Sequence, residues 1–221
     1  MIKSWEFLAL IIFSTIFLIS GQQEYCQICR DHTMCIYRNT RPVCSASRVG
    51  LNADQRREVV TIHNVLRQRV ASGEERRGRP GPQPRARNMP NMVWDQELAN
   101  IAQRWANQCK FGHDKCRNVR RFGVGQNVAI SWTSGTTPTN IITGLVTAWY
   151  DEVAAFDSRQ VEHVTKFDFV GHYTQMLWAT SVRLGCGYVA YRDRNQNAVL
   201  LVCNYGPGGN IVGGKMYDIR H

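Results

Sequence analysis

The stretch LGCGYVAYRDRNQNAVLLVCNYG, residues 184–206, contains two largely apolar runs, 184–192 and 198–205, on either side of the polar residues RDRNQN. Two such runs joined by a short polar loop are typical of a β-hairpin. If the loop is centred between Arg194 and Asn195, the numbers of paired residues add to 389, which places Cys186 opposite Cys203. Opposed residues of an antiparallel pair are close enough for a disulfide. We therefore predict an antiparallel hairpin closed by a Cys186–Cys203 bond.

Two helices are predicted upstream of the hairpin. The first begins at a capping box formed by Asn52 and Gln55 and ends at Gly73. The second begins at Asp95, whose carboxylate suits an N-cap. The positions expected to face the core are Val59, Ile62, Leu66 and Val70 in the first helix, and Leu98, Ile101, Ala102, Trp105 and Cys109 in the second.

A third helix is predicted to start at Pro138, because proline favours the first helical position, and a short fourth covers about 172–179. Residues 127–131 (NVAIS) are a strand candidate, and residues 73–90, with four prolines and three glycines, indicate a surface loop. The positions of the third helix expected to point inward are Ile142, Leu145, Val146, Trp149 and Val153. Helices that alternate with strands favour a sheet covered by helices on both faces.

The N-terminus has the pattern of a secretory signal. Lys3 precedes an apolar run from Phe7 to Ile19, and Ser20 and Gly21 follow at the position of a cleavage site. We predict a signal peptide over residues 1–21, a cysteine-rich extension over residues 22–50 that forms a loop-like lead-in, and one domain over residues 51–221. No other stretch is apolar enough to cross a membrane.

The eight cysteines all follow the predicted signal peptide. An even number of cysteines in an exported chain implies a disulfide framework, here of four bonds. Besides Cys186 and Cys203, the remaining six lie at 26, 29, 35, 44, 109 and 116. Their spacing leaves the pairing open.

The chain is basic, with a formal net charge of +10. Arginines crowd in EERRGRPGPQPRAR (74–87) and in KCRNVRR (115–121). Such charge in an exported protein favours anionic lipid headgroups or acidic glycans as partners, or is a well-solvated surface. Nucleic acid is not expected as a partner, because no basic helix has base-reading spacing.

Several segments together resemble the CAP superfamily, which groups cysteine-rich secretory proteins, antigen 5 and pathogenesis-related proteins. GHYTQMLWATS (171–181) and LLVCNYGPGGNI (200–211) are similar to its two signatures, and HNVLR (63–67) and VGQNVA (124–129) to its HNxxR and G-E/Q-N elements. Within the superfamily the resemblance is strongest to the insect venom allergen 5 branch, through RGRPGPQP (77–84), VWDQELANIAQRWANQC (93–109) and GHDKCR (112–117). The resemblance implies an α+β fold, a three-layer α-β-α sandwich with a disulfide-rich N-terminal extension, in which residues 51–221 are the CAP domain. It also implies the disulfides Cys26–Cys35, Cys29–Cys116, Cys44–Cys109 and Cys186–Cys203.

The resemblance further implies a cavity at His113, Gln126, Glu152 and His172, where Gln126 stands in place of a glutamate. A carboxylate at that position could accept a proton, whereas an amide at neutral pH does not. We expect these residues to form a hydrogen-bonded cluster that ties helices to the sheet, and His63 and Arg67 to be structural. His113 and His172 are the candidate zinc ligands, because two histidines and one glutamate form a known catalytic set.

These features predict a secreted antigen 5-like venom or salivary protein that binds a lipid, sterol or host-surface molecule, is recognised by antibodies as an allergen, and is not an enzyme. One alternative is a metal-dependent hydrolase or protease that uses His113, Glu152 and His172, although no G-x-S-x-G or H-E-x-x-H motif is present. The other is an ion-channel-directed toxin. The chain ends at His221, ten residues after the second signature, without the extra cysteine-rich module with which some relatives act on channels.

Overall fold

The computed structural model describes residues 23–220, so the predicted signal peptide lies outside the described residues. Helices and strands alternate along the chain before it closes in a hairpin. The helices include α2 (Thr33–Ile36), α3 (Ala53–Ala71), α4 (Gln96–Ala106), α5 (Ile141–Asp151) and α6 (Gly171–Met176), with the 3₁₀ turns η1 (Glu152–Ala155) and η2 (Ser158–Gln160). The strands are β1 (Ala46–Val49), β2 (Val93–Trp94), β3 (Gly125–Thr133), β4 (Arg183–Asp193) and β5 (Gln196–Gly206).

The predicted hairpin forms the centre of the sheet. Strands β4 and β5 pair antiparallel with Cys186 opposite Cys203 and Asp193 opposite Gln196, which is the predicted register. The sheet order is β1-β4-β5-β3, and β2 pairs parallel with β4. The two apolar runs predicted the hairpin, and the centre of the polar loop between them predicted its register.

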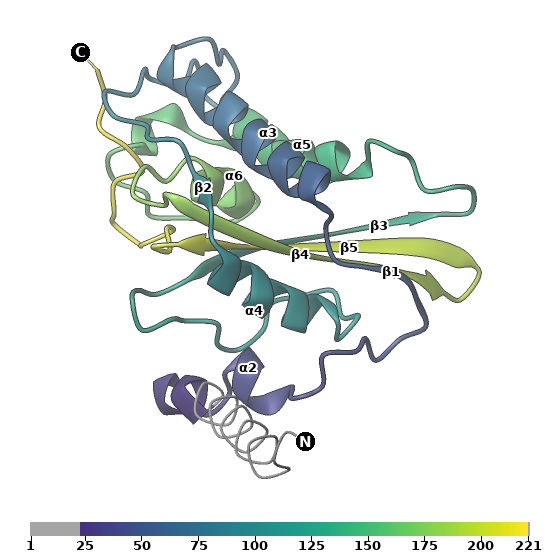
Figure 1. Cartoon of the computed structure of the whole chain (residues 1–221). Helices are drawn as coiled ribbons and strands as arrows, with labels where there is room; N and C mark the ends of the chain where they lie inside the picture. Colours follow the sequence, from purple (N-terminus) through teal and green to yellow (C-terminus); the bar gives the residue numbers. More distant parts are fainter. Residues whose placement is uncertain (1–22, 221) are drawn as a thin grey trace, which may run out of the picture.

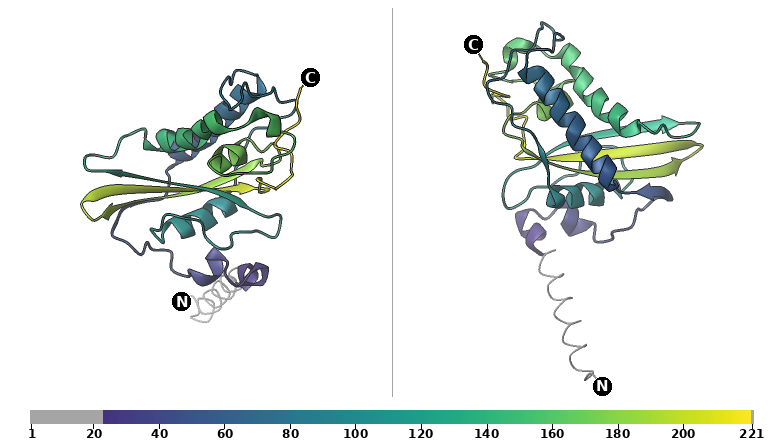
Figure 2. Two further views of the ribbon diagram at one scale, coloured as in Figure 1. Left: turned by 180° about the vertical axis from the view of Figure 1, so that it is seen from behind. Right: turned by 45° about the horizontal axis from the view of Figure 1, so that its top comes forward.

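The sheet lies between two layers of helices. Helices α3, α5 and α6 cover one face, and α4 covers the other with α2 beyond it (Figure 1). The two further views in Figure 2 show the same separation, with the N-terminal segment on the α4 side. This arrangement is the predicted α+β, three-layer α-β-α sandwich.

Side-chain alternation on β5 divides the core between the two layers. Val199, Leu201, Cys203 and Tyr205 belong to the cluster under α3, α5 and α6. Ala198, Leu200 and Val202, which point to the opposite face, pack with α4. Both faces of the strand are thus buried, as expected for a central strand between two helical layers.

Glycines on β4 allow α4 to lie directly against the sheet. A Cβ atom at Gly187 would lie 2.4 Å from the Cα of Gln103, and one at Gly185 would lie 2.2 Å from the amide nitrogen of Ala99. Any side chain at either position would push the helix away. Both glycines are therefore required by the close approach of helix and strand.

Three helix boundaries differ from the prediction. Helix α5 starts at Ile141 with Asn140 as its N-cap, because residues 138–140 form a separate turn. Helix α6 covers 171–176, because the carbonyl groups of its last residue, Met176, and of Trp178 and Ala179 accept hydrogen bonds from Arg67. Cys109 lies beyond the end of α4, at a φ of 52°.

The segment before α3 is more ordered than a loop-like lead-in. It contains α2, and β1 adds an edge strand next to β4. The side chains of β1 are mostly exposed, so the strand has no apolar alternation that could have predicted it. There are four disulfides: Cys26–Cys35 lies within this segment, Cys29–Cys116 and Cys44–Cys109 join it to the domain, and Cys186–Cys203 closes the hairpin. They are the pairs implied by the resemblance.

The loop at 73–90 has no helix and no strand, as predicted, but it is not entirely superficial. Glu75 is fully buried and accepts hydrogen bonds from Arg77 and, at 2.8 Å, from the hydroxyl of Tyr150. Burial alone would raise the pKa of Glu75, but the bonds from Arg77 and Tyr150 outweigh it and lower this pKa to about 2. One buried carboxylate therefore holds the loop against α5. In residues 23–220, no helix is both long and apolar enough to span a bilayer.

Candidate functional site

The four predicted cavity residues lie around one hollow. A cavity of about 410 Å³ is lined by His113, Gln126, Glu152 and His172. They come from the loop after α4, from β3, from η1 and from α6, so the hollow is formed where both helical layers meet the end of the sheet. The remaining lining residues are Asn127, Phe167, Phe169, Gly171 and Asn210.

Glu152 caps helix α6. Its Oε2 accepts hydrogen bonds from the backbone amides of His172 at 2.9 Å and Tyr173 at 3.1 Å. Its Oε1 accepts one from Nδ1 of His172 at 2.6 Å. Val170, the N-cap residue, offers no side-chain cap, and a carboxylate at a helix N-terminus is favourable. Both oxygens of Glu152 are therefore engaged by α6.

Gln126 is held in one orientation by a neighbouring carboxylate. Its Nε2 donates to Oδ1 of Asp114 at 3.1 Å and to Oδ1 of Asn204 at 3.0 Å. Its Oε1 must then face His113, where it accepts a hydrogen bond from Nδ1 at 2.9 Å. An amide satisfies all three contacts, because it has donors for the two oxygens and an acceptor for the imidazole.

These contacts set the chemistry of the cavity. Nδ1 of His113 and Nδ1 of His172 both donate inside the protein, so Nε2 of each ring remains for the cavity. Of the two central polar residues, Glu152 has no unengaged oxygen and Gln126 is an amide. The cavity thus presents ring nitrogens, amides and two phenylalanines, without an available carboxylate base.

The same residues fit a catalytic metal ion poorly. Such zinc sites use three protein ligands. Within residues 23–220, no three His, Cys, Asp or Glu side chains are grouped to hold a metal ion. His113 and His172 supply two nitrogens, and the carboxylate of Glu152 is used to orient α6.

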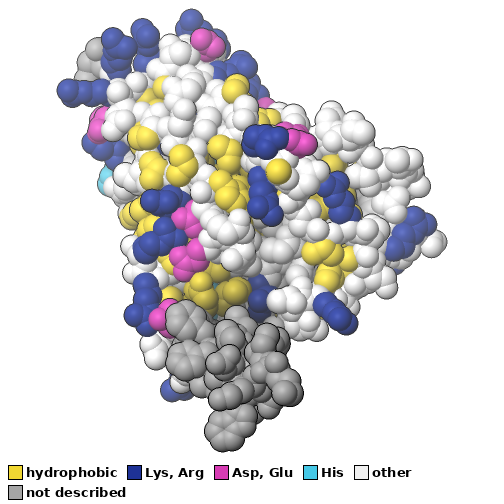
Figure 3. Space-filling model, in the orientation of Figure 1, with side chains coloured by type: hydrophobic (Ala, Val, Ile, Leu, Met, Phe, Trp, Pro, Cys, Tyr) yellow, Lys and Arg dark blue, Asp and Glu magenta, His cyan; other side chains and the backbone are white. Residues whose placement is uncertain are grey.

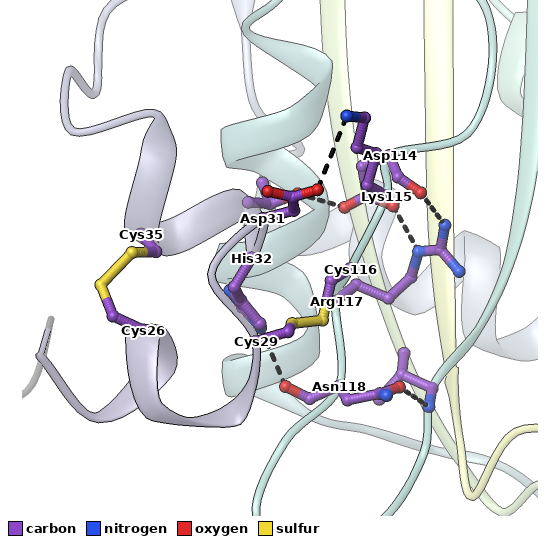
Figure 4. Close-up of a disulfide and its surroundings, with 12 residues drawn as sticks. Cys26, Cys29, Asp31, His32, Cys35, Asp114, Lys115, Cys116, Arg117 and Asn118 are labelled. Atoms are coloured by element: carbon purple, nitrogen blue, oxygen red, sulfur yellow. Dashed lines mark hydrogen bonds and ion pairs between the residues drawn. A yellow bond between two sulfur atoms is a disulfide. The ribbon is translucent and has the colours of Figure 1, made fainter.

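The N-terminal segment reaches this network through Asp114. The hydroxyl of Thr33 donates to Oδ2 of Asp114, whose Oδ1 also accepts from Nε of Arg117. Figure 4 shows this carboxylate beside Arg117 and next to the Cys29–Cys116 disulfide, which fastens the N-terminal segment there. The N-terminal segment, Asp114, Gln126 and His113 are thus connected by hydrogen bonds.

His63, on α3, lies in the same helical layer as His172, on α6, but it is closed off from solvent. Its Nδ1 donates to the carbonyl of Val59 at 2.8 Å, and its Nε2 accepts from the hydroxyl of Tyr205 at 2.9 Å. Asn127 donates to the same hydroxyl and to the carbonyl of His172, both at 3.1 Å. Burial lowers the pKa of His63 to about 4, so this ring is neutral at ordinary pH.

Arg67, one turn further along α3, is a buried cation with carbonyl partners. Its guanidinium donates to the carbonyl groups of Pro90, Met176, Trp178 and Ala179, at 2.7–3.3 Å. Burial lowers its pKa to about 10, so it stays charged at neutral pH. Arg67 therefore fastens α3 to the end of α6.

Sequence reasoning missed several residues of the site. Asp114 directly follows His113, but the sequence marks it only as part of the motif GHDKCR. Asn127, Asn210, Phe167 and Phe169 also line the cavity, and none carries a pattern that separates it from ordinary loop or strand residues. Their roles depend on tertiary contacts.

Comparison with known proteins agrees with this architecture. The model of the CAP, cysteine-rich secretory protein family matches residues 60–205. The chain therefore belongs to this family. Venom allergens are among its relatives: it is 48% identical over 200 residues to venom allergen 3 of Solenopsis invicta (86% of this chain, 84% of the relative). It is 46% identical over 201 residues to venom allergen 5 of Dolichovespula arenaria (88% and 98%).

Solved structures of the family are also similar. The crystal structure of NaASP2 with Zn²⁺ has a TM-score of 0.66 and 34% identity, with 80% of this chain and 91% of that chain covered. The structure of BmVAL-1 has a TM-score of 0.69 and 31% identity, with 80% and 87% covered.

Proposed function

We propose that this chain is a secreted, non-enzymatic binding protein of the venom allergen type, whose cavity takes the polar head of a small amphipathic ligand of the lipid or sterol class. One observation carries the proposal: both oxygens of Glu152 are engaged by α6, and position 126 is an amide. Such a cavity offers contacts for binding but no free carboxylate to take up a proton during turnover.

The cavity suits a hydroxyl head group. Nε2 of His113 is an acceptor in the tautomer that donates from Nδ1 to Gln126, so it can accept a hydrogen bond from a hydroxyl. The amide side chains of Asn127 and Asn210 line the same hollow.

Phe169 offers an apolar surface at the rim. Its side chain is 90% exposed and its φ is 59°, a region that costs a residue with a side chain about 1 kcal/mol. A bulky exposed residue held in a strained conformation is typical of a functional position. An apolar ligand tail that covered Phe169 would account for its placement.

Secretion is supported by the four disulfides, which form in oxidising compartments, and by the venom allergens among the relatives. Antibody recognition would follow from exposure of this scaffold to an immune system. Venom and saliva are the proposed sources.

The test is to identify what the protein carries. The protein is secreted from eukaryotic cells and purified, its small molecules are extracted and identified by mass spectrometry, and binding of a fluorescent fatty acid and a fluorescent sterol is then titrated. We expect a lipid in the extract and a binding loss of about tenfold for Phe169→Ser. Trp132→Ser, which removes an exposed aromatic residue from β3, serves as the matched control and should bind normally. Absence of lipid together with unchanged binding by Phe169→Ser would overturn the proposal.

The hydrolase alternative has one favouring observation, the zinc-containing structure of NaASP2, at 34% identity. His113 and His172 are the residues that would contact such an ion here. Stoichiometric zinc in the purified protein, with peptide or ester cleavage that His172→Ala abolishes, would establish this alternative and exclude the binding proposal.

A further inference from the structure

The two arginine-rich segments have different electrostatic surroundings. In 115–121 every basic side chain is ion-paired, and the pairs are Lys115–Asp31, Arg117–Asp114, Arg120–Glu24 and Arg121 with both Asp95 and Glu97. In 74–87 only Arg77 has such partners, Glu75 and Asp151. Arg76, Arg79, Arg85 and Arg87 are exposed and, among the ion pairs of residues 23–220, have none. The second segment therefore leaves its charge available to a partner.

Backbone pairing brings a further arginine to this segment. Ala86 and Ile219 form an antiparallel bridge, with hydrogen bonds from the amide of Arg87 to Asp218 at 2.7 Å and from the amide of Arg220 to Arg85 at 2.8 Å. Arg85 is consequently directly opposite Arg220, with Cα atoms about 5.5 Å apart. Alternate residues share a face, so Arg87 lies beside Arg85 at about 7 Å.

We call Arg85, Arg87 and Arg220 the arginine face. The acid on the same face, Asp218, is ion-paired with Lys215. Like charges directly opposite one another repel, so the pairing of Arg85 with Arg220 raises the free energy of the unbound protein. A bound anion would relieve this repulsion. Figure 3 shows Lys and Arg side chains gathered over the end of α3 and near the C-terminus.

The face is built on a fixed support. Gly73, at a φ of 81°, ends α3, and a Cβ atom there would lie 2.6 Å from Cγ of Arg85, so the stem of Arg85 lies across the helix end. Buried Glu75 anchors the same loop to α5 through Tyr150. An ordered support reduces the entropy lost when the arginines bind a partner.

We propose that the arginine face binds a sulfated polysaccharide, such as the glycosaminoglycans of animal cell surfaces. Arginine forms forked, bidentate hydrogen bonds with tetrahedral oxyanions, and three arginines whose Cα atoms are about 5–7 Å apart suit a chain with regularly spaced sulfates. A membrane fits less well, because interfacial proteins add apolar side chains that enter the lipid. None of the exposed large apolar residues of the described chain lies in 73–90 or 216–220. The face shares no residue with the cavity, so it does not depend on the proposed cavity ligand.

The test measures binding of the full mature chain to immobilised heparin at about 0.15 M salt. The variant Arg85→Gln/Arg87→Gln/Arg220→Gln should bind roughly 30-fold more weakly. The matched control, Arg57→Gln/Arg120→Gln/Arg192→Gln, removes the same charge from exposed arginines elsewhere and should bind within threefold of the wild type. Thermal unfolding should show both variants folded, with the arginine-face variant at least as stable as the wild type because a repulsion is removed.

Three results would overturn the proposal. Equal weakening by both variants would mean that net charge alone attracts heparin. Equal binding of desulfated heparin would exclude sulfate recognition. Tighter binding to phosphatidylserine vesicles than to heparin, lost in the arginine-face variant, would assign the surface to a membrane instead.

Discussion

His63 and His172 lie in the same helical layer, and both are held by hydrogen bonds, but they differ at one nitrogen atom. Both nitrogens of His63 are bonded to protein, to Val59 and Tyr205. His172 donates through Nδ1 to Glu152, and its Nε2 faces the cavity. A residue whose every polar atom is satisfied internally contributes to the fold, whereas one with an atom left over is available to a ligand. The comparison favours a structural role for the HNVLR segment and supports the proposal that the rim of the cavity binds a ligand.

The largest expected loss of stability concerns Arg67, which is a buried residue of the HNVLR segment, like His63. Arg67→Leu should lower the free energy of unfolding by about 4 kcal/mol, because four carbonyl groups lose a charged partner in a place that water does not reach. Urea unfolding measures the loss. Arg57→Leu, at an exposed position on the same helix, should change stability by less than about 0.5 kcal/mol. If the two variants proved equally stable, Arg67 would not be the fastening that the structure indicates.

His63 should make stability depend on pH. The folded pKa is about 4 and the ordinary value is 6.5, so between these values the unfolded chain takes up a proton that the folded chain excludes. The contribution of His63 to the free energy of unfolding is therefore complete above pH 6.5. It falls by on the order of 3 kcal/mol as the pH drops to 4. Below pH 4 this residue adds no further change. The measurement is urea unfolding at several pH values.

The variant His63→Gln isolates this contribution. It removes the titrating ring while other groups, including His32, whose pKa burial also lowers, remain in both proteins. Its stability should be lower at pH 7, and its loss between pH 6.5 and 4 should be smaller than that of the wild type. Parallel pH profiles would show that His63 is not the source of the dependence.

These contrasts also show what the sequence could predict. The hairpin register followed from a loop centred between residues 194 and 195, and the helix starts at Asn52 and Asp95 followed from capping chemistry. Strands β1 and β2 escaped prediction because they have four and two residues and gain their order from pairing with β4. Short edge strands with exposed side chains leave no periodic signal.

The site was predictable in a different way. His113, Gln126, Glu152 and His172 were identified by resemblance, and periodicity would not have grouped residues so far apart in the chain. The reason for an amide at 126 depends on Asp114, whose contact with Gln126 is made only in the folded protein. In the sequence, Gln126 is notable only because it replaces a glutamate that could act as a base. In the structure it is the donor that a buried carboxylate requires.

Gln126→Glu tests that interpretation, with a medium effect expected. The introduced carboxylate would face the oxygens of Asp114 and Asn204, so stability at pH 7 should fall by about 1–2 kcal/mol. The deficit should shrink as the pH is lowered, because protonating one carboxyl restores a donor. Adding Asp114→Asn should recover part of the loss, and a double-mutant cycle in urea measures the coupling. Additive effects would mean that Asp114 does not determine the residue at 126.

The smallest effect on stability is expected at His172. His172→Gln removes a ring whose Nε2 has no role in the fold, and Glu152 keeps its two contacts with the amides at the start of α6. The free energy of unfolding should fall by less than about 1 kcal/mol, well below the loss for His63→Gln at pH 7. Binding of the fluorescent lipid should weaken by about tenfold in the same preparation, because a ring nitrogen at the head-group position is lost. If His172→Gln and His63→Gln destabilised the chain equally and left lipid binding unchanged, His172 would belong to the fold, and the distinction drawn from its open nitrogen would be wrong.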